Sequence, residues 1–249
     1  MTAGTVPRPS GSAIHPLDDP IRSSLSGAHA RFAVWSGRIA RYHQEVAGFV
    51  GHPPRLDDQD WADLAALVGP SSEVSLRGAY VPPAGWEVLG RLAAVQLDGS
   101  ALEVAPDPDA VVLGADDVPQ MLDLVERTEP GPFRERTIEM GTYLGLRVGG
   151  RLVALAGERM HPAGWTEISA VCTDPRFRGR GFSTRLIRAV GHGIRERGEI
   201  PFLHARADNA AAIRLYESLG FTLRKRSVLT LVRTPRQFSD PGDRRDQPR

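Results

Sequence analysis

The segment from Trp165 to Gly198 constrains the fold more than any other part of this chain. It opens with WTEISAVCTDP, whose alternation and β-branched side chains predict a strand. An arginine- and glycine-rich turn, RFRGRGFS, follows, and the apolar side chains after it share one helical face: Phe182, Leu186, Ile187, Val190 and Ile194. A strand that passes through such a turn into a helix aims several backbone N–H groups at one point. Because a helix N-terminus also carries partial positive charge, the segment predicts an anion-binding site.

The other residues predict an α+β protein in two units with disordered ends. Residues 1–20 and 235–249 are rich in Pro, Ser, Gly or charged side chains, so we expect both to be disordered. Residues 21–106 predict a small α+β unit, in which apolar residues recur every three or four positions between Ala28 and Val50, as in an amphipathic helix. A turn-forming run that begins at Pro106 is the best boundary, and residues 107–234 form the second unit.

The second unit predicts a hairpin before the opening segment and a strand and helix after it. Residues 142–148 and 152–159 predict two strands joined at Gly149-Gly150. Residues 201–207 predict a further strand, and Asn209 is expected to cap a helix that ends at Gly220.

Composition excludes several classes of function. A formal net charge of +1 over 249 residues leaves no global field for nucleic acid or an anionic membrane, so neither is an expected partner. Cys172 is the one cysteine, so no intramolecular disulfide can form and no metal site is expected. No run of about 18 apolar residues could span a bilayer. The N-terminus lacks the apolar region of a secretory signal, and we expect a cytoplasmic protein.

Two motifs in order resemble the GNAT N-acetyltransferase superfamily over about residues 108–234. The first lies in the arginine-rich turn, where Arg178, Gly181 and Ser183 stand for the superfamily pattern R/Q-x-x-G-x-G/A, with a small serine in the last place. The second is similar to the superfamily's second helix on the coenzyme A side: Asn209-x-x-Ala212-x-x-x-Tyr216-x-x-x-Gly220-Phe221. Alone, the two glycines of the turn are a weak signal, since neither a dinucleotide fingerprint nor a P-loop is complete.

The resemblance implies a mixed, mostly antiparallel sheet flanked by helices. This sheet is expected to splay open between the strand from Trp165 and the strand from Pro201, and so to hold acyl-CoA. Families of this superfamily often carry a degenerate GNAT-like half before it, which is one interpretation of residues 21–106.

The implied activity is transfer of an acetyl group from acetyl-CoA, the acyl-donor cosubstrate, to an amine of a small molecule or peptide in a ternary complex. The turn would hold the pyrophosphate, because a Cβ at either glycine would obstruct the phosphate oxygens or strain the backbone. The strand backbone would hold the pantetheine and polarise the thioester. The implied coenzyme A contacts are Val171, Cys172, Thr173, Arg178, Gly179, Arg180, Gly181, Phe182, Ser183, Thr184 and Asn209.

Three side chains are candidates for catalysis. Tyr216 is the candidate general acid for the leaving thiolate. Glu167, six residues before Thr173 and expected on the same strand face, is the first candidate for the general base, and His204 is the second. The Cys172 side chain is interpreted as a core thiol, because it should point away from that face and direct transfer needs no acyl-cysteine.

Two other functions remain open. The same fold could bind acyl-CoA without turnover, as a sensor or docking module, although Tyr216 and two base candidates favour an enzyme. A nucleic-acid-binding role for the arginine-rich turn is disfavoured by the near-zero net charge. Many proteins of this kind dimerise, so a homodimer is one open assembly, and the acceptor is not readable from the sequence.

Overall fold

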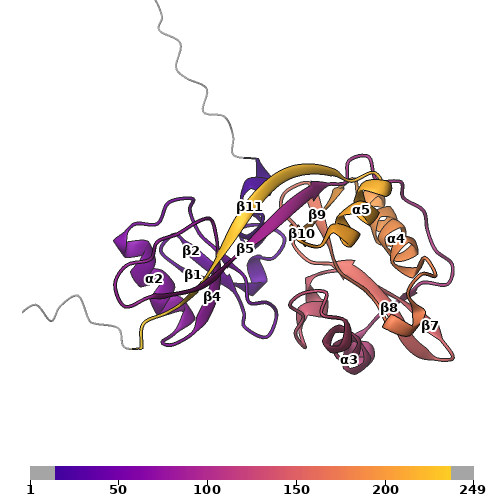
Figure 1. Ribbon diagram of the computed structural model, residues 1–249, viewed down its shortest axis with the longest axis horizontal. Coiled ribbons are helices and arrows are strands. Elements are labelled where there is room, and N and C mark those ends of the chain that lie inside the picture. Colours follow the sequence, from indigo (N-terminus) through magenta and orange to yellow (C-terminus); the bar gives the residue numbers. More distant parts are fainter. Residues whose placement is uncertain (1–14, 237–249) are drawn as a thin grey trace, which may run out of the picture.

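The computed structural model describes residues 15–236, and its largest element is an eight-stranded sheet that takes strands from both halves of the chain (Figure 1). The strand order is β4-β11-β5-β10-β9-β8-β7-β6, and every neighbouring pair is antiparallel except β9 and β10. The bounds are β4 (Glu73–Arg77), β5 (Glu87–Asp98), β6 (Val111–Val112), β7 (Tyr143–Val148), β8 (Arg151–Glu158), β9 (Trp165–Thr173), β10 (Ile200–Arg206) and β11 (Thr222–Arg233). The α+β class with a mixed, mostly antiparallel sheet is thereby confirmed.

Two helices cover opposite faces of the part of the sheet that contains β8. Helix α4 (Phe182–Glu196) buries its apolar stripe against alternate residues of β8, such as Ala154 and Ala156. Helix α3 (Val118–Thr128) packs on the other face, where Leu155 is fully buried. The remaining elements after residue 106 are η3 (Ala115–Asp117), η4 (Thr137–Met140), η5 (Pro175–Phe177) and α5 (Ala210–Ser218).

The N-terminal half contains a second, three-stranded sheet in the order β1-β2-β3. Its apolar side chains share one cluster with α2 and with β4 and β11 of the large sheet, including the fully buried Ile39, Leu64 and Leu76. The elements are η1 (Pro16–Asp18), α1 (Pro20–Leu25), η2 (Ala30–Phe32), β1 (Ala33–Ser36), β2 (Ile39–Tyr42), β3 (Val50–Gly51) and α2 (Asp58–Val68).

The helix expected between Ala28 and Val50 is wrong, because this segment forms η2 and the three short strands instead. Gly37 turns the chain between β1 and β2 with a φ of 51°, a conformation that glycine adopts without strain. Apolar residues spaced three or four positions apart are therefore also compatible with these short strands. The residues expected on one buried helix face are not uniformly buried, since Trp35 is 43% exposed whereas Tyr42 is buried.

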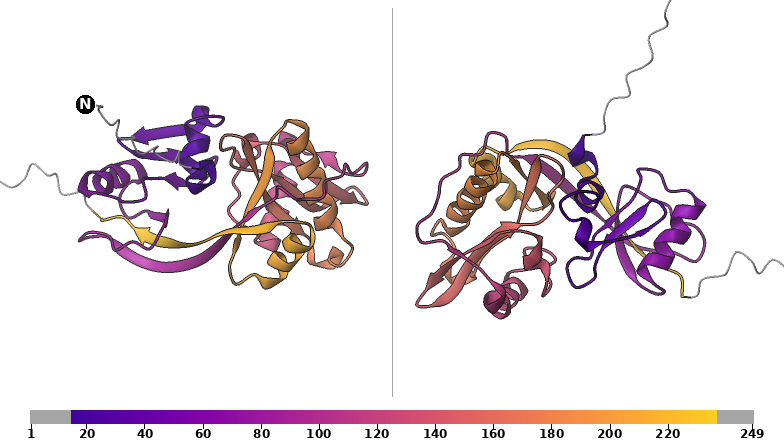
Figure 2. Two further views of the ribbon diagram at one scale, coloured as in Figure 1. Left: turned by 90° about the horizontal axis from the view of Figure 1, so that it is seen from above. Right: turned by 180° about the vertical axis from the view of Figure 1, so that it is seen from behind.

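The boundary expected at residue 106 does not coincide with a break in the sheet. Strand β5 precedes that boundary, yet it lies between β10 and β11. Figure 2 shows β5 and β11 running side by side as a long curved pair that joins the two lobes. Residues 16–20, expected to be disordered, form η1 and the start of α1, whereas the expectations for 1–14 and 237–249 lie outside the described residues.

The large sheet splays open where the resemblance implied. Strands β9 and β10 pair only at their starts, from Trp165 to Glu167 on β9 and from Ile200 to Phe202 on β10. The later residues of the two strands are not paired with each other, so one edge of β9 is open from this point on. This open edge leads directly into the arginine-rich turn and α4.

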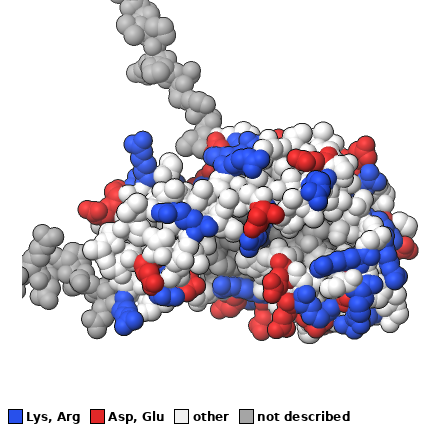
Figure 3. Space-filling view, in the orientation of Figure 1, with Lys and Arg blue, Asp and Glu red and all other residues white. Residues whose placement is uncertain are grey.

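The described surface carries charges of both signs. Figure 3 shows positive and negative side chains interspersed over one face of the molecule. Within residues 15–236, none of the helices has the length and apolar character needed to cross a bilayer.

Candidate functional site

The turn between β9 and α4 lines a cavity of about 230 Å³. The lining residues are Thr173, Phe177, Arg178, Gly179, Gly181, Phe182, Ser183, Thr184 and Leu215. All of these except Phe177 and Leu215 were expected from the sequence to contact coenzyme A. The Thr173 and Ser183 hydroxyls lie 3.0 Å apart, so a hydrogen bond ties the end of β9 to the first turn of α4.

Backbone donors at the start of α4 line this cavity. The helical ladder begins where the N–H of Arg185 donates to the carbonyl of Gly181, at 3.0 Å. The N–H groups of Phe182, Ser183 and Thr184 precede that bond, so they have no acceptor within the helix. Together with the helix dipole they favour an anion in the cavity.

Gly179 and Gly181 each have a φ of 76°. A Cβ added to either would meet no heavy atom within 4 Å, so the fold itself leaves room for a side chain there. The need for glycine therefore comes from the left-handed backbone and from the open space beside it. Ser183 is the second residue of α4, so the last place of the pattern counted from Arg178 lies in the first turn of the helix, and Arg178, Gly181 and Ser183 all line the cavity.

Two arginines of the turn are available to an anion. Within residues 15–236, Arg178 and Arg180 form no ion pair, whereas Arg176 is paired with Asp174 at 3.0 Å. The Arg180 guanidinium lies over the Phe177 ring, 5.0 Å from its centroid. Arg178 lines the cavity and Arg180 follows it in the same turn, so the charge of the turn beside the cavity is positive.

The open edge of β9 presents the backbone donors that the resemblance assigned to the pantetheine and thioester. The N–H of Asp174 donates toward β8, to the carbonyl of Val153 at 2.8 Å. Alternation along the strand then points the N–H groups of Thr173 and Val171 to the opposite edge, where β9 has left β10.

The strand face expected for Glu167 from the sequence is wrong, because β9 contains a bulge between Glu167 and Thr173. Ala170 has a φ of 54°, and the register against β8 shifts by one residue at this point. The bulge reverses the alternation, so Glu167 shares a face with Cys172 and not with Thr173. Cys172 is 6% exposed in the cluster under α3, and burial raises the pKa of its thiol, consistent with a core cysteine.

Tyr216 and Asn209 lie on the helix that the second motif predicted. Asn209 caps α5 through its side-chain oxygen, which accepts a hydrogen bond from the Ala212 N–H at 3.1 Å. The Tyr216 ring packs against Phe221 at 6.0 Å between centroids, and burial raises the pKa of its phenol. The sequence thus placed both residues on the correct element.

Glu167 lies at the point where β9 and β10 separate, inside a closed set of ionic contacts. Its side chain is fully buried and accepts two hydrogen bonds from the Arg159 guanidinium, at 2.6 and 2.7 Å. Its Oε1 also lies 2.7 Å from His204 Nδ1 on β10. Burial alone would raise the pKa of this carboxyl, but the charge and hydrogen bonds of Arg159 outweigh it and lower the pKa to about 2.

The structure thus brings both base candidates into one cluster, together with residues that sequence reasoning missed. Arg159 was expected only as the end of a strand, and Gln96, which contacts His204 at 3.0 Å, was expected only as part of another. No local pattern identified them, because Arg159 meets Glu167 across the turn between two strands and Gln96 meets His204 from a strand 108 residues away in the sequence.

A larger cavity of about 410 Å³ lies along the C-terminal half of α4, away from the residues above. Three carboxylates line it, and each already has a side-chain partner: Asp107 has Arg185 at 2.6 Å, Glu158 has Arg197 at 2.8 Å and Glu196 has His192 at 3.4 Å. We therefore assign the candidate site to the smaller cavity at the turn.

Known proteins share both the sequence and the architecture. Residues 143–229 match the FR47-like protein family. The crystal structure of a GNAT-family protein from Novosphingobium aromaticivorans is 42% identical, superposes with a TM-score of 0.80, and covers 88% of this chain and 98% of its own. The ribosomal protein bS18-alanine N-acetyltransferase of Salmonella typhimurium is 31% identical over 121 residues, which are 44% of this chain and 78% of the relative. This chain belongs to the GNAT superfamily.

A further GNAT relative is the N-alpha-acetyltransferase RimI of Mycobacterium tuberculosis, which is 38% identical over 97 residues. The match takes up 37% of this chain and spans 60% of the length of RimI. The Novosphingobium structure covers far more of the chain than the family match at 143–229, so the architecture they share extends into the N-terminal half.

Proposed function

We propose that this GNAT protein transfers an acetyl group from acetyl-CoA to an α-amino group by direct transfer in a ternary complex. The observation that carries the proposal is the cavity at the turn, where the N-terminus of α4 and the Arg178 side chain meet the open edge of β9. Acetyl-CoA would supply the activated thioester. GNAT acetyltransferases use this donor, and the residues present fit its phosphates.

The donor side follows from the backbone. The N–H groups of Phe182, Ser183 and Thr184 bind the pyrophosphate, and Arg178 and Arg180 add charge-assisted contacts. The free N–H groups of Val171 and Thr173 hold the pantetheine and the thioester carbonyl. A preorganised N–H at a developing oxyanion contributes about 3 kcal/mol to transition-state stabilisation.

Tyr216 acts as the general acid. It lies on α5, and residues of that helix pack with Phe182 around the core that α4 covers. A phenol whose pKa burial has raised stays protonated at neutral pH and can give its proton to a departing thiolate. Replacing a general acid typically lowers a rate constant about 10²- to 10⁴-fold.

The acceptor class follows from the state of the two base candidates. Glu167, with its pKa lowered to about 2, is a poor proton acceptor, and both nitrogens of His204 lie within hydrogen-bond distance of protein groups. If neither group takes the proton, the acceptor amine must lose it in solution, and this is easier for an amine whose ammonium form has a low pKa. An α-amine of pKa about 8 is about half free at pH 8, whereas a lysine amine of pKa about 10.4 is less than about 1% free. The relatives' names, which specify N-alpha and alanine acceptors, support the same class.

The test measures thiol release from acetyl-CoA with three acceptors at pH 8. These are a peptide with a free α-amine, the same peptide with a blocked N-terminus and an internal lysine, and an amino sugar. We expect turnover with the first and a loss of kcat without loss of acetyl-CoA affinity in Tyr216→Phe. Turnover with the lysine peptide alone would overturn the acceptor class. Binding of acetyl-CoA without turnover of any amine would leave a non-catalytic binding module, and absence of binding would refute the proposal as a whole.

A further inference from the structure

Gln96 connects the N-terminal half of the chain to the Glu167 cluster. It lies on β5 directly opposite His204 of β10, and it is 4% exposed. Its amide contacts three groups: the Leu17 carbonyl at 2.9 Å, His204 Nε2 at 3.0 Å and an Arg224 guanidinium nitrogen at 2.7 Å.

Arg224 determines which way this amide points. A guanidinium can only donate hydrogen bonds, so the Gln96 atom that faces it must be the carbonyl oxygen. A backbone carbonyl can only accept, so the atom that faces Leu17 must be the amide nitrogen. The opposite orientation would place donors against donors at Arg224 and oxygen against oxygen at Leu17. One partner at each end therefore fixes the amide independently of His204.

The fixed amide in turn determines where His204 carries its proton. The Gln96 nitrogen has hydrogens only to donate, so Nε2 of His204 must accept, and the proton of the neutral ring must lie on Nδ1. That N–H faces Oε1 of Glu167 at 2.7 Å, an ionised carboxylate that accepts. Both ends of the ring are therefore matched to their partners in one tautomer.

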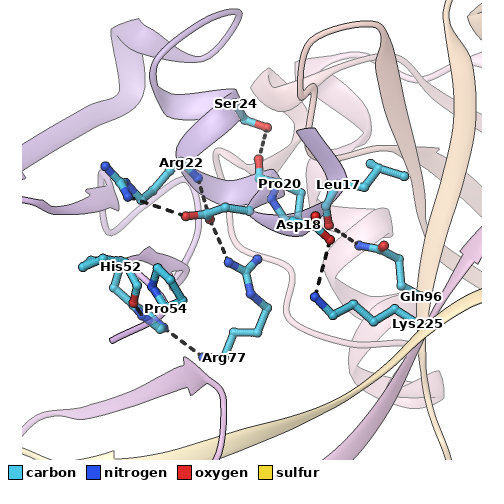
Figure 4. Close-up of polar contacts among 12 residues, drawn as sticks. Leu17, Asp18, Pro20, Arg22, Ser24, His52, Pro54, Arg77, Gln96 and Lys225 are labelled. Atoms are coloured by element: carbon cyan, nitrogen blue, oxygen red, sulfur yellow. Dashed lines mark hydrogen bonds and ion pairs between the residues drawn. The ribbon is translucent and has the colours of Figure 1, made fainter. Parts of the chain in front are cut away.

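The N-terminal segment holds this chain of contacts in place. Asp18 pairs with Arg224 at 2.9 Å, and the Leu17 side chain, 1% exposed, is buried in a cluster with Met160 and Phe202. Figure 4 shows Leu17 and Asp18 reaching across to Gln96 and to the neighbouring Lys225 of β11. Hydrogen bonds thus connect η1 through β5 and β10 to Glu167 on β9.

We propose that Gln96 is a positioning residue, which Arg224 and Leu17 orient so that His204 is held in the Nδ1–H tautomer and donates to Glu167. Its consequence for catalysis rests on the proposed function. His204 Nδ1–H donates to Glu167 beside the opening of the sheet, and the lone pair of His204 Nε2 accepts from Gln96. His204 is therefore not the base that the sequence suggested as second candidate. The N-terminal half contributes to the site by fixing this proton.

The tautomer can be measured without any substrate. Long-range ¹H–¹⁵N correlation spectra of the ¹⁵N-labelled protein distinguish protonated from unprotonated ring nitrogens, and the His204 signals are assigned by their loss in His204→Asn. We expect Nδ1 of His204 upfield, as a protonated nitrogen, and Nε2 downfield. A wild-type spectrum with the proton on Nε2 would overturn the proposal whatever the variants show.

Variants test whether Gln96 is the cause. In Gln96→Leu the two His204 nitrogen signals should move toward each other as the tautomers mix. In Gln96→Glu the new carboxylate accepts, so the ring should become doubly protonated and the Nε2 signal should move upfield to join that of Nδ1. Gln120→Leu on α3, which bonds Arg147 and not a histidine, is the matched control and should leave the His204 signals unchanged. Unchanged His204 signals in folded Gln96→Leu and Gln96→Glu would remove Gln96 from the role. The two tests are independent. A spectrum with the other tautomer would refute the role of Gln96 but not the proposed acetyl transfer, and absence of thiol release would refute the acetyl transfer but not the tautomer.

Discussion

At the scale of single residues, Glu167 is a buried carboxylate whose charge is compensated locally. Burying an ion is costly unless a partner of opposite charge and good geometry is buried with it. Arg159 meets that condition with two hydrogen bonds and is itself stacked on the Phe49 ring, 4.9 Å from its centroid. Removing both charges should therefore cost the protein less stability than removing one of them.

We predict that Glu167→Gln lowers the free energy of unfolding by about 3–5 kcal/mol, because it leaves the Arg159 charge buried without a carboxylate. The double variant Arg159→Met with Glu167→Gln should recover part of that loss. Urea denaturation followed by circular dichroism measures both. Asp208→Asn, which breaks an exposed pair with Arg206, is the control and should change the unfolding midpoint little. Equal losses in the single and double variants would contradict the argument.

His29 is a second buried ionisable residue, and it predicts how stability depends on pH. Its Nε2 faces the Met140 carbonyl at 2.9 Å and its Nδ1 the Tyr42 hydroxyl, also at 2.9 Å. Burial lowers the pKa of His29 to about 4, from an ordinary value of 6.5. Between these two values the unfolded chain binds more protons than the folded one, so folding stability falls as the pH falls.

We therefore expect the contribution of His29 to be fully present above about pH 6.5 and lost toward pH 4. The loss is about 3 kcal/mol, since one pKa unit corresponds to about 1.4 kcal/mol. Chemical denaturation between pH 7.5 and 4.5 measures it, and His29→Phe should flatten the slope. Part of the slope should remain from His161, whose pKa burial also lowers. His43→Phe on the exposed surface should keep the whole slope, and an unchanged slope in His29→Phe would refute the assignment.

At the scale of elements, the anion site that we propose at the turn into α4 depends on backbone conformation. Two left-handed glycines open the cavity and leave three helix N–H groups directed at it. Gly150, in the hairpin between β7 and β8, offers a matched comparison. It has a φ of 78° and, like Gly181, would meet no heavy atom within 4 Å of an added Cβ.

We predict that Gly181→Ala weakens acetyl-CoA binding at least tenfold, whereas Gly150→Ala leaves it unchanged. Each variant should lose about 1–2 kcal/mol of stability, because each places a side chain on a left-handed backbone. Calorimetric titration with acetyl-CoA, with thermal unfolding alongside, separates the two effects. Similar affinities in the two variants would mean that the turn does not hold the phosphates.

At the scale of the whole molecule, the two halves of the chain are joined because both contribute strands to the large sheet. Strand β5 comes from before residue 106 but supplies partners to both β10 and β11. Its fully buried Leu97 belongs to the core under α4. The N-terminal half is thus part of the same sheet that contains the candidate site.

We predict that a fragment of residues 107–236 does not fold, although it contains the whole of the 143–229 family match. Without β5, strands β10 and β11 lose their antiparallel partner and the core loses one side. A dispersed amide NMR spectrum would contradict this, and a chain trimmed to residues 15–236 should give such a spectrum as the control. Full-length protein should unfold in one transition, because β5 and β11 couple its two lobes.

Local sequence determined the elements around the site. The strand from Trp165, the turn with Gly179 and Gly181, and the helices capped by Gly181 and Asn209 are encoded by neighbouring residues, so periodicity and turn chemistry were enough to find them. The same method failed between Ala28 and Val50, because a spacing of three and four residues also suits a short hairpin.

Tertiary structure alone decided which residues meet. The pairing of β5 with β10 brings Gln96 opposite His204, and a single bulge at Ala170 places Glu167 on the face where it contacts Arg159. Neither event leaves a local pattern, since strand pairing and register depend on burial contributed by distant segments. The sequence by itself therefore determined the glycine-rich turn that leads into α4, and the fold class. The packing of distant strands decided which groups lie beside the opening and in what protonation state.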